Sequence, residues 1–235
     1  METITRPRNQ LLSSLSASDF ELLRPHLETT ELMQGDVIVA AGDNLSRVYF
    51  PDSGIISLVV SLAAGEMVEV AMIGHDSVFG GTAALDGAIS LTDAIVQLPG
   101  SASTLEVEQL RIIADHSVAS RTTLIRHEQA LFAQTQQSAA CNALHSVEAR
   151  LARCLLRMRD LAGNSKLPLT QDFLARMIGV QRNSVSGVAN ALQHAGILKY
   201  NRGHIEITDL EGLKRVACEC YGAVEEQYKR LLNLE

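Results

Sequence analysis

The chain has 235 residues, of which 46% are hydrophobic, and its formal net charge at neutral pH is −7. This length allows one large domain or two modest ones that bury a core without disulfides, and we expect two. No hydrophobic run approaches the roughly 20 residues that span a bilayer, and residues 1–10 are too polar for a signal peptide. We therefore expect a cytoplasmic protein with no membrane partner.

The first part of the chain predicts a short helix followed by strands. Residues 16–25 fit a helix that Ser16 or Ser18 caps and that ends near Pro25. From Thr29 to about Pro99, short apolar runs alternate with turn residues, which is typical of a small antiparallel roll or jelly roll but also of other β-barrels. We expect strands at residues 36–39, 48–50, 54–60, 67–73 and 93–98, with turns at 35, 41–44, 51–54, 63–65 and 74–76.

A long helix is expected in the middle of the chain. A short helix at residues 105–113 precedes it, and it runs from about 117 to 144. Leu124 and Leu131 lie seven residues apart, as in a coiled-coil seam, but polar residues interrupt that seam. A weak coiled coil and a surface helix of a monomer both fit this pattern.

Three further helices are expected beyond the long one. Residues 145–158 predict a basic helix with Ser146 as its cap, and residues 163–168 predict a loop. Residues 169–192 then predict two short amphipathic helices separated at Gly179, where a glycine permits a sharp bend. This arrangement is a helix-turn-helix.

The second short helix has an outer face suited to reading bases. Arginine can donate two hydrogen bonds to guanine, asparagine can pair with adenine, and serine can contact bases or phosphate. An ordinary helical hairpin with a solvated polar face is the alternative. The residues assigned to base reading are Arg182, Asn183, Ser184, Ser186 and Gly187.

The segment after the helix pair predicts a β-hairpin. Residues 195–208 fit two strands around a turn at 201–203, which makes a winged helix-turn-helix the favoured interpretation. Residues 209–232 should be helical, with an interruption near Gly212 or Gly222. We expect phosphate contacts from Thr170, Gln171, Gln181, Lys199 and Arg202, with His204 a further candidate.

Charge is distributed unevenly along the chain. Residues 1–144 carry 7 basic and 17 acidic side chains, a net charge of −10, whereas residues 145–215 carry 11 and 6, a net charge of +5. The basic block coincides with the predicted winged helix. Because phosphate contacts supply most nonspecific affinity for DNA, this local charge supports a nucleic-acid partner.

Residues 170–209 resemble the DNA-binding domain of the Crp/Fnr transcription regulators. The resemblance implies an α+β fold: an effector-type β-roll related to cyclic-nucleotide-binding domains (1–115), a dimerisation helix and hinge (116–144), and a winged helix-turn-helix domain with a helical tail (145–235). It implies a homodimer that binds double-stranded DNA, with RNA polymerase as a further candidate partner. Asn183 and Gly187 replace the family's usual Glu and second Arg, so we expect a different target sequence.

The cyclic-nucleotide site of that family is altered here. The family holds the cyclic phosphate with a Gly-Glu pair and a later Arg beside Ser or Thr, but this chain has Gly80-Gly81 and Thr92-Asp93. We expect no tight binding of cyclic AMP or cyclic GMP. The remaining scaffold binds another small molecule or none. Its candidate residues are Phe79, Gly80, Gly81, Thr82, Ser90, Thr92 and Asp93, with Thr135 and Gln136 from the long helix by family register.

No cofactor or metal is predicted. No cysteine precedes Cys141, which disfavours the family's iron-sulfur type, and a turn histidine such as His75 is a poor candidate for haem. Cys218 and Cys220 lack partners at metal-finger spacing. If both lay on one helix, their side chains would point roughly 200° apart, which disfavours joint chelation.

We expect a regulator and no enzyme. The chain lacks a nucleophile elbow, a phosphate loop, a His-Glu-x-x-His helix and a dinucleotide fingerprint. The alternative function is a ligand-binding or protein-interaction module whose winged helix does not read DNA.

Overall fold

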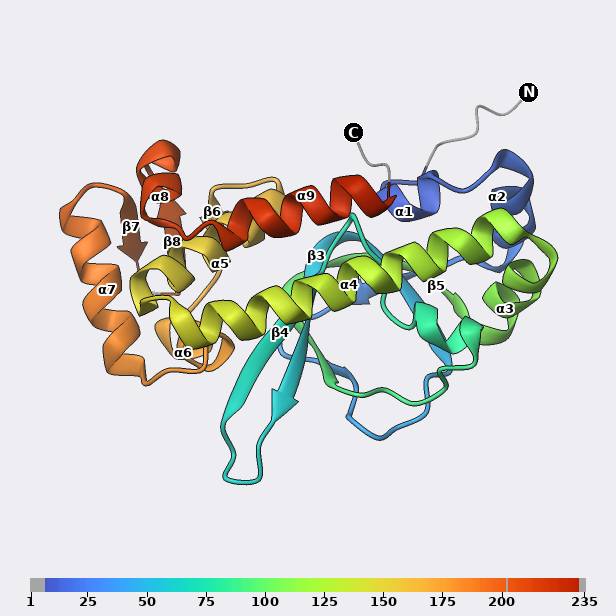
Figure 1. Ribbon diagram of the computed structural model, residues 1–235, viewed down its shortest axis with the longest axis horizontal. Helices are drawn as coiled ribbons and strands as arrows, with labels where there is room; N and C mark the ends of the chain where they lie inside the picture. The colour runs from blue at the N-terminus through green and yellow to red at the C-terminus, as the bar shows by residue number, and fades with distance from the viewer. Residues whose placement is uncertain (1–6, 202, 233–235) are drawn as a thin grey trace. The chain divides into compact units, whose positions relative to one another are not determined.

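The structure is a computed structural model that describes residues 7–201 and 203–232 (Figure 1). The described chain forms two compact units. The first unit holds the residues up to Leu58, residues 72–132 and the chain from Tyr228 onwards, and the second holds residues 59–71 and 133–227.

The first unit contains most of an antiparallel sheet, as predicted, and the part of this sheet between residues 59 and 71 falls in the second unit. The strand order is β1-β5-β3-β4, and β2 also pairs with β5. Apolar side chains of the strands are fully buried, among them Val48, Phe50, Ile55 and Ile73. The strands are β1 (Glu28–Leu32), β2 (Val37–Val39), β3 (Arg47–Ser61), β4 (Met67–Ile73) and β5 (Asp93–Glu106).

The predicted turn at residues 51–54 is wrong, because β3 runs through it. Gly54 adopts a φ of +80°, which favours glycine, and a Cβ there would lie 2.7 Å from the Leu98 carbonyl oxygen. A Cβ on Gly100 would in turn lie 2.4 Å from the Ser53 carbonyl carbon. The two glycines therefore let β3 and β5 pass very close to each other. Residues 51–54 lie within one continuous strand and do not separate two strands.

The chain before the sheet packs against it through a buried asparagine. Asn9 caps the short helix α1 (Gln10–Ser13), which the sequence analysis did not predict, by accepting from the Leu12 amide. Its side-chain amide donates to the carbonyls of Pro51 and Ser77 at 3.0 and 2.8 Å. The predicted helix at 16–25 is confirmed as α2 (Ala17–Leu23), with Ser16 as its cap and a short turn, η1 (Arg24–His26), after it.

Two helices follow the sheet. The helix expected at 105–113 is α3 (Val107–His116), because β5 extends to Glu106. The long helix is confirmed as α4 (Val118–Leu144). Asp19 of α2 accepts hydrogen bonds from the hydroxyls of Ser117 and Ser120, at 2.8 and 2.7 Å, and so ties α2 to the start of α4.

The second unit contains the winged helix-turn-helix fold. Its helices are α5 (Val147–Ala162), capped by Ser146 as predicted, α6 (Gln171–Met177), α7 (Arg182–His194), α8 (Leu210–Val216) and the first part of α9 (Cys220–Leu232). The residues of α9 from Tyr228 on belong to the first unit. Its core is formed by buried side chains such as Leu151, Leu155, Leu174, Val185 and Leu213.

Two predictions for this unit need correction. The segment 163–168 is not only a loop, because β6 (Lys166–Leu167) pairs with β8 (His204–Ile207), which pairs with β7 (Leu198–Asn201). The helical tail is interrupted at residues 217–219 and not at a glycine. Gly212 lies inside α8, where its amide donates to the capping side chain of Asp209.

Among the residues that the structure describes, no helix combines the length and the apolar character needed to cross a membrane.

Candidate nucleic-acid interface

Local interactions fix the geometry of the helix pair. Thr170 caps α6 by accepting from the Phe173 amide at 3.2 Å. Gly179 adopts a φ of +63°, which permits the bend between α6 and α7. Leu174 of α6 and Val185 and Leu192 of α7 are buried. The predicted helix-turn-helix is therefore confirmed in its elements and its turn.

The start of α7 presents the expected outer face. The Arg182 side chain is 64% exposed, and Asn183, Ser184 and Gly187 are also exposed. Gln181 is the cap of α7, and in the described structure its side chain accepts no amide of the first turn. Amides at a helix N-terminus favour anions, so this end of α7 suits a phosphate.

Ser186 and Gln171 contact each other. The Ser186 hydroxyl donates to Gln171 Oε1 at 2.6 Å, and both residues are half-buried. This bond joins the middle of α7 to the first residue of α6. A base contact by Ser186 or a phosphate contact by Gln171 would therefore have to replace or share it.

The wing is a regular hairpin that is attached to α7. Lys199 is exposed on β7, opposite Glu206 of β8, whose carboxylate also lies 3.8 Å from Lys166 Nζ. The Tyr200 amide donates to the Gln193 side chain at 2.9 Å, which fixes β7 against α7. Arg202, a predicted phosphate contact, lies outside the described residues.

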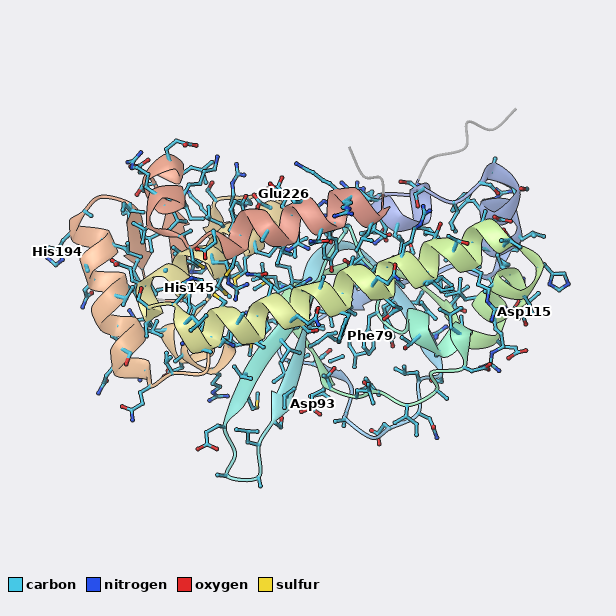
Figure 2. All side chains as sticks on the ribbon, in the orientation of Figure 1. Phe79, Asp93, Asp115, His145, His194 and Glu226 are labelled. Atoms are coloured by element: carbon cyan, nitrogen blue, oxygen red, sulfur yellow. The ribbon has the colours of Figure 1, made fainter. Side chains whose placement is uncertain are left out.

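In the first unit, four of the residues proposed for an effector pocket, Phe79 to Thr82, lie at the start of a short 3-10 helix, η2 (Gly81–Leu85). Gly80 precedes it with a φ of +85°, and a Cβ there would lie 2.9 Å from the Arg47 carbonyl oxygen. The Phe79 ring lies 6.2 Å from that of Tyr49. Figure 2 labels Phe79 and Asp93. The backbone conformation just before η2 therefore favours glycine at position 80, and the Arg47 carbonyl leaves no room there for a side chain.

Two of the other candidate residues, Ser90 and Asp93, form side-chain hydrogen bonds with backbone groups. The Ser90 hydroxyl donates to the Thr92 carbonyl at 2.7 Å, and Asp93 Oδ1 accepts from the Ala41 amide at 2.9 Å. Thr135 and Gln136 belong to the second unit. There, Gln136 lines a cavity of about 210 Å³ together with residues of α9.

A buried histidine that was not among the predicted site residues lies beside this loop. His127 of α4 is fully buried, and its Nε2 accepts from the Val78 amide at 3.2 Å. Its Nδ1 lies 3.3 Å from Glu128 Oε1, and the same oxygen would lie 3.3 Å from a Cβ on Gly81. His127 lies three residues after Leu124 and four before Leu131, on the face of the expected seam, but a lone histidine on such a face is not by itself a signal for a binding site.

Positive charge is scarce throughout this region. The sequence has no Lys or Arg between Arg47 and Arg111. Arg47 forms ion pairs with Glu28 and Glu106, and Arg111 donates to the Ala83 carbonyl at 3.0 Å and lies 3.7 Å from Glu108. Glu128 thus places a carboxylate near Gly81 where an anion-binding loop would need cations.

Cys218 and Cys220 do not lie on one helix, which corrects the expectation that their side chains point away from each other. Cys218 lies between α8 and α9, and Cys220 is the first residue of α9. Their thiols lie in one cluster with Cys141 and His145, in which the four possible ligand atoms are within 4.8 Å of one another. Partners that the sequence places about 75 residues away were invisible to a search for local spacing.

Comparisons with known proteins agree with this architecture. A model of the cyclic nucleotide-binding domain matches residues 29–117, and a model of the Crp-like helix-turn-helix domain matches residues 149–216. The cyclic AMP receptor protein of Thermus thermophilus is 24% identical to the chain over 217 residues, which cover 88% of this chain and 96% of that protein.

Solved structures share the fold. FixK2 from Bradyrhizobium japonicum matches with a TM-score of 0.71 at 18% identity, covering 82% of this chain and 98% of its own. The c-di-GMP-responsive regulator CLP of Xanthomonas campestris matches with a TM-score of 0.66 at 16% identity, covering 83% and 100%. With a cyclic nucleotide-binding domain followed by a Crp-like helix-turn-helix, the chain belongs to the Crp/Fnr family of transcription regulators.

Proposed function

We propose that this Crp/Fnr-type regulator binds a specific site in double-stranded DNA as a homodimer, in the cytoplasm, without control by cyclic AMP or cyclic GMP. The observation that carries the proposal is the exposed first turn of α7 on a buried helix pair. Arg182, Asn183 and Ser184 project from a helix whose opposite face is anchored by Val185, Ala189 and Leu192. This is the arrangement that major-groove readout needs.

In this proposal the residues divide by role. The base-reading set stays Arg182, Asn183, Ser184, Ser186 and Gly187, and the phosphate set stays Thr170, Gln171, Gln181, Lys199 and Arg202. The proposed division of the chain also stays 1–115, 116–144 and 145–235. Family members act as transcriptional regulators and not as enzymes, and RNA polymerase remains a candidate partner.

The dimer contact is proposed for α4. Val118, Ile125 and Phe132 recur every seven residues and are 83%, 44% and 63% exposed. Leu124, one of the two leucines expected at the seam, is only 3% exposed and lies beside Gly81 within the first unit. Leu131 is half-buried. The exposed heptad positions therefore support a seam shifted by one residue from the predicted one.

The predicted insensitivity to cyclic nucleotides rests on charge. The η2 loop has no basic residue within its stretch of sequence, and Glu128 lies near Gly81. A cyclic phosphate there would meet the Glu128 carboxylate, and the Arg111 guanidinium, which donates to the Ala83 carbonyl of η2, is already paired with Glu108. This charge balance is unfavourable for a bound anion at low dielectric. The Phe79–Thr82 and Ser90–Asp93 segments, with Thr135 and Gln136, remain the proposed scaffold for another small molecule or for none.

Selection of bound duplexes from a random library tests the proposal. We expect one enriched, roughly palindromic sequence, whose recovery is unchanged by cyclic AMP or cyclic GMP. The affinities for the enriched duplex and for random duplex should both fall steeply as salt increases, because binding releases counterions from phosphates. Absence of any enriched sequence, together with salt-independent binding, would favour the protein-interaction alternative. Micromolar cyclic AMP affinity by calorimetry would contradict the effector part alone.

A further inference from the structure

A buried cluster in the second unit brings together side chains that the DNA-reading site does not use. Cys141 lies in the last turn of α4, His145 follows the end of that helix, Cys218 lies in the α8–α9 turn and Cys220 begins α9. All three cysteines are at most 9% exposed, and His145, labelled in Figure 2, is 24% exposed. Three thiols and an imidazole are one of the common ligand sets of structural zinc.

The distances in the cluster suit a single metal ion. Cys141 Sγ lies 3.5 Å from Cys218 Sγ, and Cys220 Sγ lies 3.5 Å from His145 Nδ1. In a tetrahedral zinc site with Zn–S bonds of about 2.3 Å, neighbouring sulfur ligands are about 3.8 Å apart. The four ligand atoms lie within 4.8 Å of one another, so one ion could contact all of them after small side-chain rotations. A multi-iron cluster would hold its ligands further apart.

Neighbouring groups orient the ligands as in known metal sites. The second ring nitrogen of His145, Nε2, lies 3.2 Å from Glu219 Oε1, on the side away from Cys220. Histidines that bind metals usually donate their other N–H to a carboxylate, which fixes the ring and its tautomer. The side-chain amide of Gln137 donates to Cys220 Sγ at 3.0 Å. An amide donor stabilises a thiolate more than a thiol.

The electrostatic surroundings also favour a bound cation with thiolates. A coordinated metal ion removes the protons of its thiol ligands outright. Three thiolates and a divalent ion carry one net negative charge, and the charges of Arg150 and Arg153 act on this cluster.

We propose that Cys141, His145, Cys218 and Cys220 bind one zinc ion. The four protein ligands would complete a tetrahedral shell with no open position, which is the form of a structural and not a catalytic site. The ion would clamp the start of α9 onto the end of α4 and thereby give the C-terminal segment a role. A disulfide between Cys141 and Cys218 would not account for the positions of Cys220, His145 and Glu219 beside these two thiols.

The test is the zinc content of the full-length chain, purified under reducing conditions without a metal-affinity tag. We expect one zinc ion per chain by elemental mass spectrometry. Replacement by Co²⁺ should give the visible bands of tetrahedral cobalt with thiolate charge transfer. Cys220→Ser and His145→Ala should lose both signals. Cys154→Ala is the matched control, because Cys154 is buried in α5 outside the cluster, and it should keep them.

Two further variants keep the test decisive if a ligand variant unfolds. His145→Cys replaces one ligand by another and should retain the metal, and Glu219→Gln should weaken zinc affinity by about 10- to 100-fold with unchanged circular dichroism. The proposal is overturned if the folded wild-type chain retains neither zinc nor cobalt. Zinc content equal in Cys220→Ser, His145→Ala and the wild type overturns it too, as does a Cys141–Cys218 disulfide found in place of any metal. Because these readouts need no DNA, they are independent of the proposed DNA binding.

Discussion

Arg182 Nε lies 3.2 Å from Asp172 Oδ1, so an ion pair joins the first turns of α6 and α7. Both side chains are more than half exposed, which makes the pair weak and easily exchanged. An arginine that donates to guanine must leave this carboxylate, which then faces the DNA as an uncompensated negative charge. Asp172 should therefore oppose DNA binding.

Asp172→Asn is expected to tighten binding to the selected duplex. Exposed pairs contribute about 0.2–1 kcal/mol, so the gain should be about 1.5- to 5-fold in dissociation constant at low salt. Fluorescence anisotropy measures it. Glu211→Gln on α8 is the control for net charge, because its carboxylate pairs with Lys214. An equal gain in both variants would show that overall charge, and not the Arg182 contact, is responsible.

The Arg182→Ala variant should lose selectivity between DNA sequences, whereas the Lys199→Ala variant should bind all DNA sequences more weakly and to about the same extent. Loss of a bidentate base contact costs about 1–3 kcal/mol at one position of the site, and loss of a phosphate contact reduces the salt slope by about one. Competition between selected and scrambled duplexes separates the two effects. Unchanged discrimination by the Arg182→Ala variant would refute its assignment to base reading.

Ile125→Glu and Phe132→Glu should each convert the dimer to monomers at micromolar concentration. Each change puts a charge at a seam position that the single chain leaves exposed, so the fold of the chain should survive. Sedimentation velocity measures the effect. Ala119→Glu, also exposed on α4 but about 120° around the helix from Ile125, adds a negative charge away from the seam and should leave the dimer intact. A dimer that withstands both seam variants would place the contact on another surface.

Asp19 should make stability depend on acid pH. Burial acts to raise the pKa of Asp19, but hydrogen bonds from Ser120, Ser117 and Ser16 outweigh it and hold the pKa below its ordinary value. The stability gained from this carboxylate is therefore present at neutral pH and is lost as pH falls through the lowered pKa. Urea unfolding should show Asp19→Asn less stable than wild type at pH 7, and the difference should shrink below about pH 4. A difference independent of pH would rule out the carboxylate as its source.

The parts of the fold that local sequence determines were predictable. The turn at Gly179, the caps Ser16 and Ser146 and the periodicity of α6 and α7 all act within a few residues, and the structure confirms them. The path of β3 was not predictable, because Pro51 and Gly54 resemble a turn and only the approach of Gly100 shows a continuous strand. The same holds for β6, whose two residues become a strand only by pairing with β8.

The candidate sites divide in the same way. The exposed first turn of α7 follows from one helical stretch, so its residues could be named in advance. The Ser186–Gln171 bond and the Arg182–Asp172 pair depend on how two helices cross, and no pattern within either helix reveals them. The cysteine and histidine cluster depends on distant segments that meet in the folded chain. For that reason spacing rules for metal fingers could not find it.

The three side-chain hydrogen bonds of Asn9 determine where an isolated effector domain can begin. The match to the cyclic nucleotide-binding domain begins at residue 29, a natural place to cut. Such a cut would remove the donor to the Pro51 and Ser77 carbonyls and expose the core around Leu11, Leu12 and Leu23. A fragment that starts at residue 29 should therefore aggregate, whereas one that starts at residue 7 keeps the whole cap of the sheet. Ligand screens on the isolated domain should use the longer fragment.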